Sequence, residues 1–338
     1  MHLLYFAAGM ASVDASAATY LRGKRVPDFF VVGHMKSGTT ALHMMLRRHP
    51  QIVIKQKEPW FLADELRSRA KLRPGGTRTP QTLEEYLSLF DATRPGQLVG
   101  DASALYLWSR TAAKAIADLQ PAARIIAVLR EPASFLRSLH FQFVQTYTEP
   151  EKDFRKALSL ESARRQGRKL PRNEYWPQAT LYSEHVRYVE QLRRYEALFP
   201  AQQMLVIIYD DFRDDNEGVV RAIWRFLGVD DTIPVRTTEA NPTVRVRTPR
   251  LHELAHAVAV GQGLFSRAVN ATVKTLAPPQ LSRESAIAIR DRLFFDQPRP
   301  PDEALMLELR RRFKPEVAAL SEHLSRDLVT LWGYDSLG

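Results

Sequence analysis

The residues Phe29-Phe30-Val31-Val32-Gly33-His34-Met35-Lys36-Ser37-Gly38-Thr39-Thr40 carry the strongest structural signal in this chain. Their first four, all apolar, predict a buried strand, and the segment 41–48 that follows predicts a helix. Free backbone N–H groups at the start of such a helix form an anion site. Lys36 adds a positive charge, and Ser37, Thr39 and Thr40 add hydroxyl donors. The pattern predicts a phosphate-binding loop, which is typical of enzymes that use nucleotides.

The loop differs from that of ordinary nucleoside triphosphatases. Gly33 and Gly38 have the G-x-x-x-x-G spacing, but Lys36 lies inside the loop, and Gly38 is followed by Thr39 rather than by lysine. No acidic magnesium ligand follows a later apolar strand in the usual way. A turn that only caps a helix is the simpler alternative for these residues.

A second strand, Arg124–Leu129, ends in Arg130, and Pro132 suits the first turn of a helix. Arg130 therefore lies at the carboxyl end of a strand, where open α/β sheets bind ligands. Ser138 follows about two turns into the helix. An arginine fork and a hydroxyl together can hold a second phosphate.

With these residues the chain resembles the PAPS-dependent sulfotransferases, in particular bacterial-type members with motifs like those of heparan sulfate sulfotransferases. PAPS is 3′-phosphoadenosine 5′-phosphosulfate. The resemblance covers roughly residues 27–230, and its further elements are Lys57-Glu58-Pro59-Trp60-Phe61, Gly100–Ser103, Met204–Asp211 and Leu331–Tyr334. One departure concerns the second phosphate site, where the family has an arginine near position 135 and this chain has Phe135 and then Arg137.

The resemblance implies a role for each site residue. Lys36 and Glu58 are the catalytic residues, with Glu58 as the general base and Lys36 neutralising charge on the leaving 3′,5′-ADP. His34 and His140 are alternative bases. The implied cofactor-binding residues are Lys36, Ser37, Gly38, Thr39 and Thr40 for the 5′-phosphate, with Arg130 and Ser138 for the 3′-phosphate. No metal is required, because lysine and the helix dipole supply the positive charge.

Composition agrees with this interpretation. The net charge of +10 suits polyanionic ligands. Nucleic acid is disfavoured as a partner, because no aromatic-rich binding motif or dense basic tail accompanies the charge, and the basic run 164–172 is interpreted as a solvated loop. The absence of cysteine excludes disulfides and cysteine-bound metals. No apolar run reaches the roughly 18 residues of a membrane span, and residues 1–19 lack the positive start of a signal peptide, so we expect a cytoplasmic protein.

The alternation of strand and helix patterns predicts an α/β fold, P-loop-like and three-layered, with a central parallel sheet and helices on both faces. We expect an N-terminal segment 1–26 and one domain 27–338, made of a nucleotide-binding core 27–235 and a mainly helical part 236–338. The expected strands are 28–32, 97–100, 125–129 and 204–208. The expected helices are 39–48, 81–90, 109–119, 133–147, 178–198, 217–227 and 302–313. The oligomeric state does not follow from the sequence.

Two other functions stay open. A nucleotide kinase with a variant loop is one. A zinc hydrolase is the other, because His252-Glu253-Leu254-Ala255-His256 matches the H-E-x-x-H motif; a surface helix is the simpler interpretation of that match.

For the sulfotransferase, we expect the acceptor to be a hydroxyl of a small or amphipathic molecule, such as a glycoside, lipid or natural product. Four aromatic residues either line the acceptor mouth or belong to the core: Trp60, Phe61, Trp108 and Trp176.

Overall fold

The structure, a computed structural model, describes residues 20–21, 23–66, 79–171, 177–237, 245–246, 295–296 and 300–337. A five-stranded sheet in the order β4-β5-β3-β6-β7 forms the centre, and all of its strand pairs are parallel. Its strands are β3 (Phe29–Gly33), β4 (Ile52–Val53), β5 (Leu98–Ala102), β6 (Arg124–Leu129) and β7 (Met204–Ile208). The expected parallel sheet is therefore confirmed, and the short edge strand β4 adds to the four expected strands.

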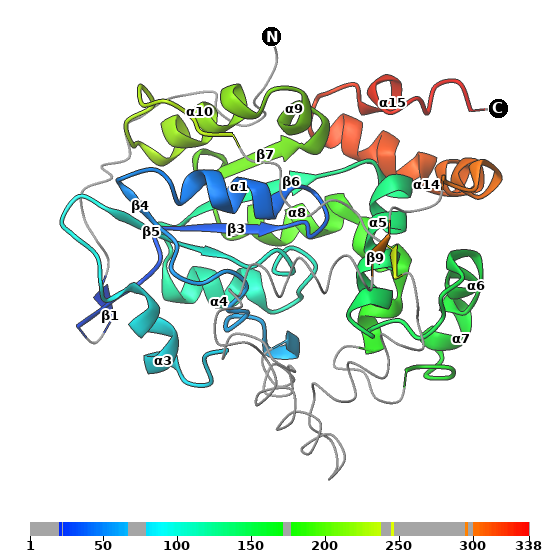
Figure 1. The fold of residues 1–338 in the computed structure, drawn as a ribbon, viewed down its shortest axis with the longest axis horizontal. Helices are drawn as coiled ribbons and strands as arrows, with labels where there is room; N and C mark the ends of the chain where they lie inside the picture. The colour runs from blue at the N-terminus through cyan, green and yellow to red at the C-terminus, as the bar shows by residue number, and fades with distance from the viewer. Residues whose placement is uncertain are drawn as a thin grey trace, which may run out of the picture.

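Helices cover both faces of the sheet (Figure 1). Alternate residues of β3 point to opposite faces: Phe29 and Val31 pack in one apolar cluster, and Phe30 and Val32 in the other. The first cluster includes side chains of α1 (Thr39–Leu46), α9 (Tyr209–Asp214) and α10 (Asn216–Leu227). The second includes side chains of α4 (Ala112–Leu119), α5 (Pro132–Gln145) and α8 (Tyr188–Glu196). Two cores separated by one sheet make the three-layer fold that the sequence predicts.

The C-terminal helices belong to the second layer. They are α14 (Glu303–His323) and α15 (Leu328–Leu331), and α14 packs against α5 and α8. Figure 1 shows them in orange and red beside α9. The helix expected at 302–313 continues through Pro315 to His323. The described part of the C-terminal region is thus mainly helical, as predicted.

Smaller elements complete the described fold. They are the paired strands β1 (Tyr20–Leu21) and β2 (Lys24–Arg25), the paired strands β8 (Arg245–Val246) and β9 (Phe295–Asp296), the helices α3 (Leu83–Leu87), α6 (Phe154–Ser159) and α7 (Glu161–Arg165), and the 3-10 turns Ser88–Phe90, Pro177–Thr180, Tyr182–Val186 and Ala201–Gln203.

The single helix expected at 178–198 is wrong. Two 3-10 turns precede α8, because side chains occupy carbonyl groups that a continuous helix needs for its own bonds. Arg164 donates to the Thr180 oxygen at 3.3 Å, and Gln191 Nε2 donates to the oxygens of Glu184 and His185 at 2.9 and 3.2 Å.

The chain order places a switch point at the centre of the sheet. The chain leaves β3, builds β4 and β5 on one side, and then crosses to build β6 and β7 on the other. Loops that follow β3 and β6 therefore diverge at the carboxyl edge, which is where open α/β sheets bind ligands.

Candidate functional site

The loop predicted to bind a phosphate lies between β3 and the start of α1. Gly38 has a φ of 78°, a left-handed conformation that glycine adopts at little steric cost. A side chain there would also contact the Phe212 ring of α9 at 3.0 Å. The first N–H groups of α1 have no partner within the helix. The Ser37 hydroxyl is fully buried, and no described residue hydrogen-bonds to it. The loop thus presents unsatisfied donors at a helix N-terminus.

Arg130 joins this loop to the end of β6. Its Nη1 donates to the carbonyl oxygen of Lys36 at 2.8 Å, and its guanidinium lies over the Tyr209 ring, 4.7 Å from the centroid. Tyr188 donates its hydroxyl to the Arg130 carbonyl oxygen at 2.8 Å. The two phosphate elements expected from the sequence are therefore neighbours in space.

Positive charge is concentrated at this junction. Burial, then the charges of Arg130 and Lys57, lower the pKa of Lys36 to about 8. Burial, then the charge of Arg130, lowers the pKa of Arg137. No described acidic side chain forms an ion pair with Lys36 or Arg130; the Lys36 ammonium lies 3.4 Å from the Gln142 amide oxygen. Cations that repel one another favour a bound polyanion.

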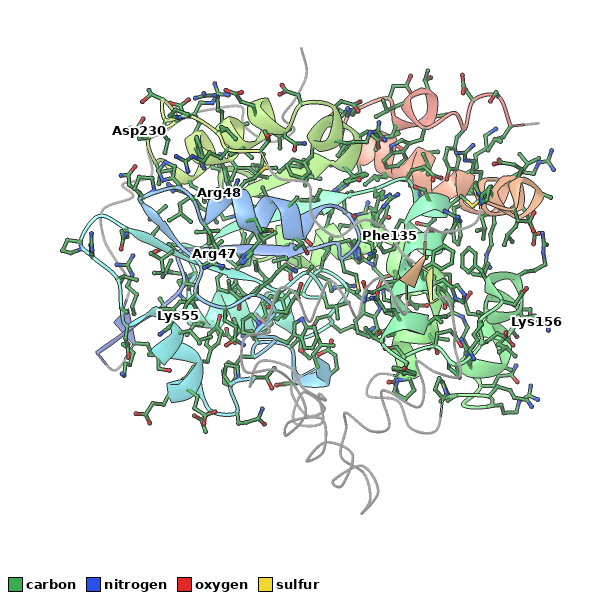
Figure 2. The ribbon with its side chains drawn as sticks, in the orientation of Figure 1. Arg47, Arg48, Lys55, Phe135, Lys156 and Asp230 are labelled. Carbon is green, nitrogen blue, oxygen red and sulfur yellow. The ribbon has the colours of Figure 1, made fainter. Side chains whose placement is uncertain are left out.

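Positions 135 and 137 of α5, near which the resemblance implies a second arginine, differ in environment. Phe135 is fully buried, and its ring lies 5.1 Å from the His34 ring. Figure 2 shows it in the interior of the molecule. Arg137 is half-buried, and burial and then the nearby charge of Arg130 lower the pKa of the Arg137 guanidinium. Ser138 is buried on the same helix. Of the two positions, 137 therefore holds a cation whose pKa is lowered by burial and by the charge of Arg130.

Three donors hold the Glu58 carboxylate. They are Lys57 Nζ at 2.5 Å, Trp60 Nε1 at 2.6 Å and the Ala104 backbone N–H at 3.0 Å. The Glu58 N–H also donates to the Ala102 oxygen at the end of β5, 2.9 Å away. The Glu58 side chain is 17% exposed, so solvent and small molecules reach it. The pairing with Lys57 and a role as base are compatible, because a carboxylate has about four acceptor positions.

The alternative bases are buried. Burial lowers the pKa of His34 to about 3, and its Nε2 lies 2.6 Å from the Gln191 amide oxygen. The His140 ring is engaged at both nitrogens, by the Tyr182 hydroxyl at 2.9 Å and the Lys152 oxygen at 3.1 Å, and burial lowers its pKa. Accessibility therefore favours Glu58 over both histidines.

Sequence reasoning missed several contacts of the site. His43 of α1 is buried, and its pKa is lowered to about 4 by burial and then by Lys57 and Arg47. The C-terminal segment also reaches the site: Tyr334 donates to Glu131 at 2.5 Å, and Trp332 Nε1 donates to Asp210 at 2.9 Å. These partners are distant in the chain, so no local pattern indicates them.

The four aromatic residues expected at the acceptor mouth or in the core differ in burial. Trp60 and Phe61 are 4% and 6% exposed and belong to the core. Trp108 is half-buried and stacks on the His185 ring at 5.2 Å, whereas Trp176 lies outside the described residues. The core interpretation is confirmed for Trp60 and Phe61.

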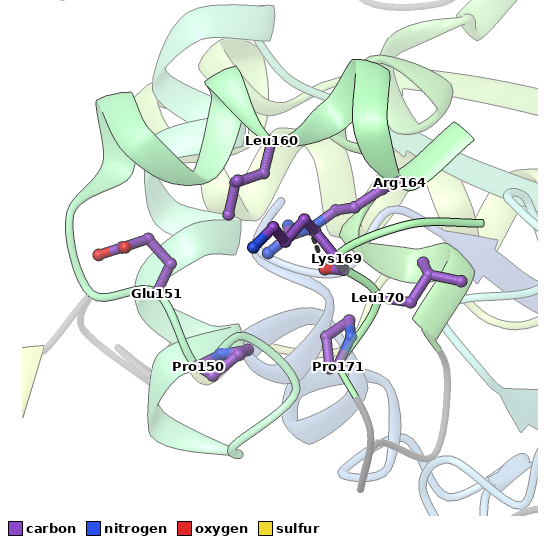
Figure 3. Close-up of a pocket in the computed structure, with 7 residues that line it drawn as sticks. All are labelled: Pro150, Glu151, Leu160, Arg164, Lys169, Leu170 and Pro171. Atoms are coloured by element: carbon purple, nitrogen blue, oxygen red, sulfur yellow. Dashed lines mark hydrogen bonds between the residues drawn. The ribbon is translucent and has the colours of Figure 1, made fainter. Parts of the chain in front are cut away.

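A cavity of about 540 Å³ lies elsewhere, beside α6 and α7 (Figure 3). Its lining residues are Pro150, Glu151, Leu160, Arg164, Lys169, Leu170 and Pro171. The Arg164 guanidinium binds both carboxylate oxygens of buried Glu149, at 2.6 and 2.7 Å. The interpretation of the basic run as a solvated loop is thus wrong at Arg164, whose charge a buried partner neutralises. None of the lining residues belongs to the expected site.

His252 and His256 lie outside the described residues. Within the described ranges, no group of three or more His, Asp or Glu side chains is arranged to hold a metal ion. No helix in the described part of the chain is long and apolar enough to cross a membrane.

Comparison with known proteins identifies the family of this chain. A sequence model of the Sulfotransferase family matches residues 27–232. Bifunctional heparan sulfate N-deacetylase/N-sulfotransferase 4 of Mus musculus is 27% identical over 214 residues, which cover 60% of this chain and 22% of that protein. Carbohydrate sulfotransferase 15 of Mus musculus is 23% identical over 260 residues, covering 62% of this chain and 45% of that protein. The chain therefore spans less than half the length of these relatives.

The crystal structure of a sulfotransferase from Alicyclobacillus acidocaldarius is similar over nearly the whole molecule. It has a TM-score of 0.61 and 25% sequence identity, and the match covers 91% of this chain and 98% of that one. Because the family match covers residues 27–232, more than half of the chain, the protein is a member of the sulfotransferase family.

Proposed function

We propose that the protein transfers a sulfuryl group from PAPS to a hydroxyl of a small or amphipathic acceptor, with release of 3′,5′-ADP. The observation that carries the proposal is the cationic junction of Lys36 and Arg130, next to the buried Ser37 hydroxyl that no described residue satisfies. A ligand with two phosphates suits this junction, because Lys36 and Arg130 follow adjacent parallel strands at one edge of the sheet.

The proposed division of labour follows from position. We assign Ser37, Gly38, Thr39 and Thr40 to the 5′-phosphate, and Arg130 and Ser138, assisted by Arg137, to the 3′-phosphate. PAPS, when bound, supplies an activated sulfuryl group with a good leaving group. Lys36 stabilises the negative charge that develops on that leaving group. These positions need no metal, because the protein itself supplies the positive charge.

Glu58 is proposed as the general base that takes the proton from the attacking hydroxyl. Its exposed fraction and its fixed orientation support this role. The sulfotransferase family match favours this function over a kinase or a zinc hydrolase. The cytoplasmic location stays a prediction.

Replacing Arg130 by Ala is expected to abolish selectivity for the 3′-phosphate. Wild type should bind 3′,5′-ADP far more tightly than 5′-ADP. Losing a charge-assisted contact costs about 1.5–3 kcal/mol, or roughly 10–150-fold in Kd. Titration calorimetry with both nucleotides measures the ratio. Arg155→Ala, which removes an exposed arginine paired with Glu308, is the control and should keep wild-type selectivity. Equal affinity of the wild type for both nucleotides would refute the assignment.

Replacing Glu58 by Gln should lower turnover about 10²–10⁴-fold, because the side chain keeps its shape but no longer accepts a proton. The affinity for 3′,5′-ADP should stay within about twofold of wild type, as expected when only the base is lost. Steady-state transfer assays and calorimetry separate the two effects. Glu84→Gln, on the exposed first turn of α3, is the matched control. Near-normal turnover in Glu58→Gln would show that another residue is the base.

The affinity for 3′,5′-ADP should weaken as the pH rises above about 8. The pKa of Lys36 is lowered to about 8 in the free protein, so its charged form, which the anion requires, becomes depleted above that pH. Binding should therefore take up a proton near pH 8, which calorimetry in two buffers of different ionisation enthalpy detects. Lys36→Met should bind more weakly at pH 7 and show little further decline up to about pH 9. The same pH dependence in wild type and variant would contradict this assignment.

The acceptor class is tested with radiolabelled PAPS and panels of glycosides, phenols, lipids, amines and anionic polysaccharides. We expect label on hydroxyls of small or amphipathic molecules. The relatives are named for heparan sulfate N-sulfation and for carbohydrate sulfation, so amines and long polysaccharides are the informative rivals. Label that enters only those two classes would disprove the acceptor proposal and leave the sulfuryl-transfer proposal intact.

A further inference from the structure

Asp101, near the end of β5, is a fully buried carboxylate held by three hydroxyl groups. Ser103 Oγ donates to Oδ1 at 2.7 Å, and the hydroxyls of Tyr86 and Tyr106 donate to Oδ2 at 2.8 and 3.0 Å. No described lysine or arginine forms an ion pair with it. Burial raises the pKa of Asp101 to about 7. A buried carboxylate without a cationic partner is unfavourable, so its contacts need an explanation.

Two of the three hydroxyls also contact the segment that carries Glu58. Ser103 Oγ accepts the Trp60 N–H at 3.2 Å, and the Tyr106 oxygen accepts the Leu62 N–H at 3.1 Å. A hydroxyl has a single proton. Ser103 and Tyr106 each donate their hydroxyl proton to Asp101. The lone pairs of their hydroxyl oxygens therefore accept the backbone N–H groups of Trp60 and Leu62.

The Glu58 segment needs such support. Glu58 and Trp60 have φ values of 59° and 53°, the left-handed region that non-glycine residues rarely adopt. Such conformations persist only where the surroundings over-determine them. Here the bonds from Ser103 and Tyr106 act together with the Glu58 N–H bond to Ala102. Trp60 in turn donates its indole N–H to the Glu58 carboxylate.

We infer that Ser103 and Tyr106, whose hydroxyl protons Asp101 accepts, are positioning residues for Glu58 that act on the backbone of residues 58–62. The inference rests on the proposed role of Glu58 as the base. Asp101 itself lies too deep to contact an acceptor, since it is fully buried beneath its three hydroxyl partners. Misplacement of a catalytic group by about 1 Å can cost on the order of 10²-fold in rate.

A matched pair of variants isolates this path. Ser103→Ala and Tyr86→Phe each remove one hydroxyl that donates to Asp101, but only Ser103 also accepts a backbone N–H of the Glu58 segment. The Tyr86 ring, stacked on Phe61 at 4.8 Å, is retained in Tyr86→Phe. Tyr106→Phe is a second test variant, because it removes the acceptor for Leu62.

Ser103→Ala is expected to lower kcat about 10–100-fold without changing the KM for PAPS. Tyr86→Phe should keep kcat within about twofold of wild type, although both variants lose one bond to Asp101. Amide hydrogen exchange gives a readout that does not need activity: exchange at the Trp60 N–H should accelerate about tenfold or more in Ser103→Ala and stay unchanged in Tyr86→Phe. Tyr106→Phe should accelerate exchange at Leu62.

The outcomes separate this inference from the proposed function. Unchanged kcat and exchange in Ser103→Ala would overturn it, as would equal losses in Ser103→Ala and Tyr86→Phe, which indicate a merely structural network. Accelerated exchange in Ser103→Ala, together with full activity of Glu58→Gln, would support the positioning of the segment and refute Glu58 as the base.

Discussion

The hydrogen bond from Arg130 to the carbonyl oxygen of Lys36 links the loops that follow β3 and β6. These two strands are neighbours at the centre of the sheet, and their loops diverge at its carboxyl edge. The bond brings two cations together at a place where burial already disfavours charge, as the lowered pKa of Lys36 indicates. A bound polyanion would offset this repulsion between the two cations.

The remainder of the fold holds this junction in place. Tyr209 of α9 lies under the Arg130 guanidinium, and Arg326 binds Asp211 of the same helix with both terminal nitrogens. Glu131 caps α5 through the N–H groups of the residues that follow it and also accepts the Tyr334 hydroxyl. The C-terminal segment, although far away in sequence, thus binds both α9, which lies against Arg130, and Glu131, which follows Arg130 in the chain.

Local patterns predict much of this protein and fail where long-range packing decides. The strands β3, β6 and β7 follow from uninterrupted apolar runs, and the turn from β3 into α1 follows from Gly38 and the residues around it. The contact of Glu131 with Tyr334 spans 203 residues and has no local signal. The hydroxyl network of Asp101 likewise depends on the packing of α3, which brings the Tyr86 hydroxyl to the end of β5. The helix expected at 178–198 is interrupted where Arg164 from α7 and Gln191 from α8 donate to its carbonyl groups.

A crystal structure of the protein with 3′,5′-ADP tests the central claim most directly. We predict that the 5′-phosphate binds the backbone N–H groups at the start of α1 and that the 3′-phosphate lies within hydrogen-bonding distance of Arg130. Nucleotide bound elsewhere, for example in the cavity beside Arg164, with the loop of Lys36 left empty, would contradict it.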